Sequence, residues 1–182
     1  MSRIPTPATI NDAPSASQPL LEGVQKSLGS VPNLFRLVAN SPAGLEGYLG
    51  LSGALGKGKL DPATRERIAL AIAEINGCGY CLAAHTYLGA NIAKLTETEI
   101  TANRRGGSTD VKADVAVRFA VEIVRERGQV DADAVEAVRN AGYSDAEIVE
   151  IVAHVALNTL TNYMNEVFGT EIDFPQADKL VA

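Results

Sequence analysis

The chain has 182 residues, a net charge of −6 and 46% hydrophobic residues, which is enough apolar material for one domain with a buried core. The isoelectric point of about 4.9 and the lack of any lysine and arginine block argue against nucleic acid as a partner, because phosphate binding needs a cationic surface. The N-terminus has no signal-peptide pattern, and no apolar run is long enough to span a membrane. The sequence therefore predicts a cytoplasmic protein that binds neither nucleic acid nor membrane.

Two segments differ in composition. Residues 1–19 are rich in proline and small polar residues, and we expect a partly extended arm, available to lie on a neighbouring subunit. Residues 20–182 have helical periodicity almost throughout, and no stretch alternates apolar and polar residues as a strand would. The predicted fold class is all-α, with one helical domain over 20–182.

The predicted helices begin and end at residues with known capping preferences. In chain order, a first helix ends at Gly29, a second starts at Pro32, and a third covers about 43–56. Asp61-Pro62 opens the next helix, and Asn76-Gly77 ends it. Further helices are expected over about 78–93, 110–127 and 131–140.

Two pairs of residues have the spacing of a capping box, Thr96 with Glu99 and Ser144 with Glu147. The helix after Ser144 is long and apolar, so we expect it at the centre of the core. Its apolar residues are Ile148, Ile151, Val152, Val155, Leu157 and Leu160.

The segment from Gly77 to His85 is the most distinctive, because it holds both cysteines and one of only two histidines in the pattern C-x-x-C-x-x-x-H. Cys78 stands where a helix starts, and a helix N-terminus favours the thiolate form of such a cysteine. Cys81 and His85 lie one helical turn apart, so His85 can take or return a proton at Cys81. The two cysteines can also close a disulfide.

The order of attack has two readings. The helix-start argument makes Cys78 the more acidic thiol, whereas the neighbouring imidazole favours Cys81 as the nucleophile. We follow the imidazole, because a nearby base both ionises a thiol and protonates a departing alkoxide.

Glu66 is the predicted partner of His85. If the two helices that meet at Gly77 form an antiparallel hairpin, Glu66 and His85 lie roughly 16 Å and 12 Å from the turn, within reach of one glutamate side chain. Glu74 is the alternative. Glu66 is favoured because it stands in an apolar stripe, where a carboxylate needs a specific reason to be.

Glu66 followed by Cys78, Cys81 and His85 resembles the active-site signature of the alkylhydroperoxidase D-like proteins of the carboxymuconolactone decarboxylase superfamily. The tail segments 158–163 and 170–175 resemble its peroxidase-related branch. The resemblance covers most of the chain after Leu20. It implies an all-helical fold with a central hairpin that carries the motif.

The resemblance also implies a function. Cys81 would attack a peroxide with His85 and Glu66 as proton relay, and Cys78 would close a disulfide that an external dithiol protein or small thiol reduces. It implies a homo-oligomer, trimer or hexamer, and no metal or organic cofactor. One departure is Tyr80, which stands where the best-studied branch has a second histidine; we treat Tyr80 as a possible auxiliary residue.

Other readings stay open. The cysteines can be buried spacers, or two ligands of a zinc site completed by His85 with His154 or Glu66. The chain can be a decarboxylase-like lyase, or a module whose disulfide switches the oligomeric state. A row of asparagines, Asn158, Asn162 and Asn165, is expected in loop capping or subunit contacts rather than catalysis.

Overall fold

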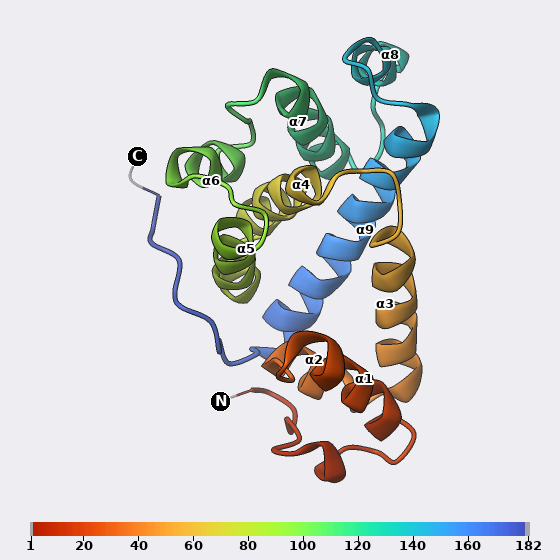
Figure 1. Ribbon diagram of the computed structural model, residues 1–182, viewed down its shortest axis with the longest axis vertical. Coiled ribbons are helices and arrows are strands. Elements are labelled where there is room, and N and C mark those ends of the chain that lie inside the picture. The colour runs from red at the N-terminus through yellow and green to blue at the C-terminus, as the bar shows by residue number, and fades with distance from the viewer. Residues whose placement is uncertain (1, 181–182) are drawn as a thin grey trace.

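The computed structural model describes residues 2–180, and within them it contains nine α-helices, one short 3-10 helix and no strand (Figure 1). The predicted all-α fold class is therefore confirmed. No helix in this range is both long enough and apolar enough to cross a membrane. The elements are η1 (Ile10–Asp12), α1 (Gln18–Leu28), α2 (Asn33–Val38), α3 (Pro42–Leu55), α4 (Pro62–Ile75), α5 (Gly79–Asn91), α6 (Glu97–Arg104), α7 (Val111–Arg125), α8 (Ala132–Asn140) and α9 (Asp145–Phe168).

Helix boundaries lie close to where the capping residues predict them. The Asp61 side chain accepts a hydrogen bond from the Thr64 N–H at 2.9 Å, and Pro62 is the first residue of α4. Ser144 and Glu147 form the predicted capping box at the start of α9. Local sequence is therefore sufficient to start both helices.

The helix α4 forms the centre of the fold, and α5, α6, α7 and α9 pack around it (Figure 1). Every residue from Ile68 to Ala73 is buried. The helix after Ser144, α9, packs against α2, α3, α4, α5, α7 and α8, so its expected central position is confirmed, but not every residue that we assigned to the core is buried. Helix α9 buries only one face, and Val152 and Leu160, which we assigned to the core, are 45% and 38% exposed.

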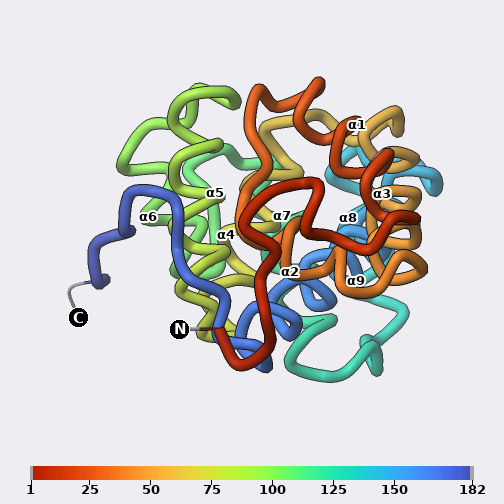
Figure 2. The backbone as a smooth tube through the Cα atoms, turned by 90° about the horizontal axis from the view of Figure 1, so that it is seen from below, coloured from red at the N-terminus to blue at the C-terminus, as the bar shows by residue number. Residues whose placement is uncertain are grey.

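The N-terminal arm lies on its own chain. The Arg3 N–H donates to the carbonyl of Phe168 at 2.6 Å, and Arg36 donates to the carbonyl of Ala8 at 2.8 Å. Seen from below, this arm and the C-terminal tail run over the same face of the molecule (Figure 2). Helix α1 begins at Gln18, and the division of the chain at residue 19 stays a prediction.

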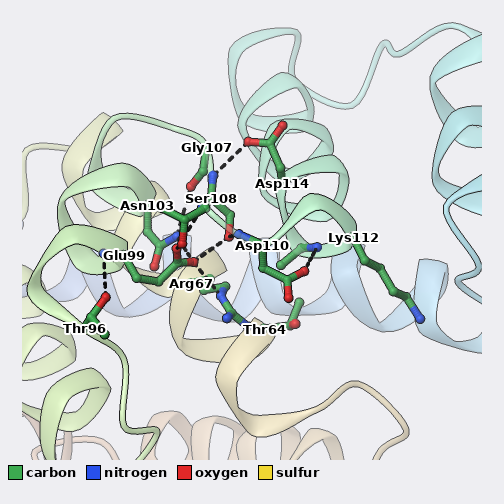
Figure 3. A network of polar contacts seen from close by, with 12 residues as sticks. Thr64, Arg67, Thr96, Glu99, Asn103, Gly107, Ser108, Asp110, Lys112 and Asp114 are labelled. Atoms are coloured by element: carbon green, nitrogen blue, oxygen red, sulfur yellow. Dashed lines mark hydrogen bonds and ion pairs between the residues drawn. The ribbon is translucent and has the colours of Figure 1, made fainter.

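The predicted capping box of Thr96 and Glu99 is only half formed. The Thr96 hydroxyl accepts from the Glu99 N–H at 3.2 Å, but the Glu99 carboxylate, whose residue is 4% exposed, turns inward (Figure 3). Its donors are Arg67 Nε, Asn103 Nδ2, the Ser108 hydroxyl and the Thr109 N–H and hydroxyl. Glu99 therefore joins α4 and α6 to the loop that precedes α7.

Replacing Glu99 with Gln should lower the free energy of unfolding by about 2 kcal/mol, because a buried network loses its charged acceptor. Burial raises the pKa of Glu99, but its hydrogen bonds from Ser108, Thr109 and Asn103 lower it by more, to about 2. The carboxylate is protonated more readily when unfolded, so its stabilisation is complete above the ordinary pKa of about 4.3 and is lost as pH falls toward 2.

Urea unfolding of wild type and Glu99→Gln from pH 7 to 2.5 measures this difference. The matched control is Glu97→Gln, an exposed acid in the same helix, which should leave the curve unchanged. Equal losses in both variants would contradict the role given to the buried carboxylate.

Candidate functional site

The hairpin of α4 and α5 sets the position of both cysteines. Gly77 adopts a positive φ of 65°, a conformation that favours glycine, and the Cys78 N–H donates back to the carbonyl of Ala73 at 2.9 Å. Helix α5 begins at Gly79, one residue later than predicted, which makes Cys78 its N-cap. The Cys78 sulfur accepts from the Cys81 N–H at 3.4 Å. The two thiols are therefore held together at the first turn of α5.

The two thiols have opposite acidities. A hydrogen bond from the Cys78 thiol lowers the pKa of Cys81 to about 6, and the charge of His85 acts in the same direction against the effect of burial. The same hydrogen bond to Cys81, together with burial, raises the pKa of Cys78 well above its usual range. Both cysteines are free and buried. This electrostatic arrangement favours Cys81 as the thiolate, although the helix-start argument alone would favour Cys78.

The structure brings Glu66 and His85 together across the hairpin. His85 Nδ1 lies 2.9 Å from Glu66 Oε2, and the two side chains are 21% and 22% exposed. Glu74, the alternative, instead accepts from Arg104 Nε at 2.7 Å. Burial lowers the pKa of His85, but the Glu66 carboxylate raises it by more, so this pKa lies above its ordinary value. An imidazolium beside the Cys81 thiolate is therefore favoured.

Two asparagines of α9 complete the surroundings of Cys81, contrary to our expectation of loop capping or subunit contacts. Asn165 Nδ2 donates to the Cys81 sulfur at 3.2 Å. Asn162 Oδ1 accepts from Asn76 Nδ2 at 2.9 Å, and Asn162 also lowers the pKa of Cys81. Sequence showed the helical spacing of these residues, but their burial against the thiol depends on how α9 crosses the hairpin.

Tyr48 of α3 is a further residue that the sequence analysis missed. Burial raises its pKa, and the negative charges of Cys81 and Glu66 add to this effect, so Tyr48 lies close enough to the site to sense both. Its hydroxyl therefore stays protonated. No motif identifies it, because α3 reaches the hairpin only through tertiary packing.

The Tyr80 hydroxyl makes its hydrogen bonds to residues outside the thiol pair. The Tyr80 hydroxyl donates to Asp173 at 2.8 Å and accepts from the Leu34 N–H at 3.2 Å, so it connects the C-terminal tail to α5 and α2.

His154 is 6% exposed, and burial lowers its pKa to about 4. In the part of the chain that the structure describes, no three histidine, cysteine, aspartate or glutamate side chains gather as a metal ion would require.

Residues 42–126 match the carboxymuconolactone decarboxylase family. No curated protein matches the sequence. A similar solved structure, an alkylhydroperoxidase AhpD core, belongs to an uncharacterized peroxidase-related protein from Ralstonia eutropha JMP134. It is 26% identical, with 94% of this chain and 92% of the other covered and a TM-score of 0.83.

A second uncharacterized peroxidase-related protein, from Silicibacter sp. TM1040, is 24% identical over 93% of this chain and 91% of the other, with a TM-score of 0.80. The debrominase Bmp8 is 21% identical over 92% of this chain and 91% of its own, with a TM-score of 0.72. A variant of Bmp8 is solved in complex with 2,3,4-tribromopyrrole. At these identities the likeness concerns the fold alone.

Histidine NMR offers a direct test of the site, because the chain has only two histidines. In wild type, His154 should titrate with a pKa of about 4 and His85 with a pKa above 6.5. Glu66→Gln should lower the pKa of His85, since the imidazolium loses its charged acceptor. Glu74→Gln is the matched control and should leave both unchanged; a His85 titration that is insensitive to Glu66 would contradict the pairing.

Proposed function

We propose that the chain is a thiol-dependent peroxidase of the alkylhydroperoxidase D-like part of the carboxymuconolactone decarboxylase superfamily, a superfamily of enzymes. The family match over residues 42–126 and the similarity to an alkylhydroperoxidase AhpD core support this proposal. One observation carries the proposal. Cys81, with a pKa of about 6, lies beside a second thiol and one helical turn from an imidazole that is paired with a carboxylate. A thiolate at neutral pH, a proton donor and a resolving thiol are the groups that peroxide reduction needs.

In the oxidising half of the proposed reaction, the Cys81 thiolate attacks one oxygen of a hydroperoxide. A sulfur–oxygen bond forms as the oxygen–oxygen bond breaks, which leaves a sulfenic acid on Cys81 and an alkoxide or hydroxide. The His85 imidazolium protonates that leaving group, so an alcohol or water departs. Glu66 holds the imidazole in place and stabilises its charged form.

In the reducing half, the Cys78 thiol attacks the sulfenic sulfur of Cys81. A disulfide forms, and the sulfenic hydroxyl leaves as water with the thiol proton. An external dithiol then supplies two electrons and two protons by thiol–disulfide exchange and restores both thiols. The proposed partners are thus a peroxide and a dithiol of a reducing compartment, for which we propose the cytoplasm, and the chemistry uses no resident metal or organic cofactor.

A stopped-flow assay of peroxide consumption with a small dithiol tests the proposal. Cys81→Ser should abolish turnover, and Cys78→Ser should stop after one turnover with a sulfenic acid on Cys81 that dimedone traps. Glu66→Gln should slow turnover roughly ten- to a hundredfold, because the proton relay is weakened. Glu74→Gln, on the same helix, should behave as wild type.

Unchanged rates in Cys81→Ser and Glu66→Gln would refute the mechanism. Sulfenic acid trapped only in Cys81→Ser would reverse the order of the thiols. Lactone turnover that survives the loss of both cysteines would favour the decarboxylase-like alternative. A change of mass on oxidation without peroxide turnover would favour a redox-switched module. A bromopyrrole should be tested in the same assay as a second electrophile. The debrominase has a similar fold, and a variant of it is solved in complex with 2,3,4-tribromopyrrole.

We also propose that the chain assembles with copies of itself through the outer face of α9. Helical intervals along the helix bring the exposed apolar residues of this face into one stripe. They are Val149, Val152, Ala156, Leu160, Tyr163 and Val167. A second copy of the same helix matches such a face because its apolar side chains can interdigitate.

Light scattering after size exclusion should therefore give the mass of an oligomer, a trimer or a hexamer. Leu160→Arg should shift this mass toward the monomer, because a charge would be buried in the interface. The control is Val111→Arg, at the 86% exposed start of α7, which should leave the mass unchanged. A monomeric wild type would contradict the assembly.

A further inference from the structure

The environment of the Cys81 sulfur contains two side-chain amides that come from α9, more than eighty residues later in the chain. Asn165 Nδ2 donates to the sulfur at 3.2 Å, and Asn165 is 2% exposed. Asn162, one turn earlier on the same face, is fully buried. Neither residue belongs to the cysteine–histidine motif or to the Glu66–His85 pair.

The orientation of Asn162 is set from its other side. Asn76, the C-cap of α4, donates to Asn162 Oδ1 at 2.9 Å. This bond occupies the carbonyl end of the amide and turns the NH₂ end away from Asn76. That nitrogen is buried and has no partner among the described residues at ordinary hydrogen-bond geometry, but Asn162 lies close enough to Cys81 to lower the pKa of that thiol. A donor so placed stays unsatisfied as long as its neighbour is a neutral thiol, which accepts hydrogen bonds weakly.

We propose that Asn165 and Asn162 form a donor pair whose task is to hold the Cys81 sulfur as an anion. A thiolate carries three lone pairs and a full charge, and hydrogen bonds to a charged acceptor are stronger than those to a neutral one. Ionisation of Cys81 therefore strengthens the hydrogen bond from Asn165 and offers a charged acceptor to the buried amide of Asn162. Both asparagines are positioning residues, since they act through Cys81.

The neighbouring asparagine shows that burial in α9 does not by itself create this role. Asn158, also on α9 and 6% exposed, donates along its own helix to the carbonyl of His154 at 2.8 Å. Its amide is thus satisfied locally. Three asparagines at helical intervals have different partners, and only the two nearer the C-terminal end of α9 face the thiol. Asn158 therefore provides a matched control.

The inference deepens the proposed peroxidase function, on which its biological meaning rests, but its test needs no peroxide. In a Cys78→Ser background, absorbance at 240 nm against pH reports the Cys81 thiolate alone. Asn165→Ala and Asn165→Leu, the second of which keeps the volume, should raise the pKa of Cys81 by about one unit, a roughly tenfold fall in its ionisation constant. Asn162→Ala should shift the pKa in the same direction, and Asn158→Ala should not move it.

Circular dichroism and thermal unfolding of each variant show whether its fold is retained. An unchanged Cys81 pKa in the folded Asn165 and Asn162 variants would overturn the inference, even if wild type reduces peroxide. An equal rise in Asn158→Ala would also overturn it, because general loosening of α9 would then account for the effect. A rise confined to Asn165 and Asn162 supports the inference even if peroxide proves not to be the substrate.

Discussion

The hydrogen bond between the thiols of Cys78 and Cys81 raises the pKa of Cys78 and lowers the pKa of Cys81. The chemistry of the site depends on this difference. The raised pKa of Cys78 keeps its thiol protonated, and the hydrogen bond from this thiol lowers the pKa of Cys81. The bond exists because the turn at Gly77 makes Cys78 the N-cap and places Cys81 in the first turn of α5. Without this geometry, burial would raise the pKa of both cysteines, and at Cys81 only His85 and the asparagines of α9 would oppose that effect.

Three helices supply the groups that act on this thiol pair. Helix α5 carries Cys81 and His85 and has Cys78 as its N-cap, α4 carries Glu66, and α9 carries Asn162 and Asn165. Helix α4 holds them together, because its residues 68–73 are buried among the helices packed around it. The packing that buries α4 therefore also sets the relative positions of the groups in the site. His85 and Glu66 remain partly exposed, so the imidazole forms the side of the site that solvent can reach.

Three acids of α4 and α6 illustrate how tertiary partners determine the contacts of a side chain. Glu99 has the spacing of a capping box but serves as the acceptor for α4 and the loop before α7. Glu66 and Glu74 lie on one helix, yet each pairs with a different basic side chain, His85 or Arg104. Tyr80 likewise uses its hydroxyl on Asp173 of the tail. In each case the partner that the fold brings near, rather than the local pattern, decides which contact forms.

Sequence alone determined the helical class, the starts of α4 and α9 and the shared face of Cys81 and His85, because capping and a four-residue spacing are local properties. It also indicated the approach of Glu66 to His85, since a tight turn between two helices leaves few ways to pair them. Tertiary structure decided the rest. It buried α4 from Ile68 to Ala73 but left one face of α9 exposed, and it turned Asn165 and Asn162 toward a thiol more than eighty residues away. The crossing of α9 over the hairpin depends on how all the helices share one core, and no local spacing encodes such a crossing.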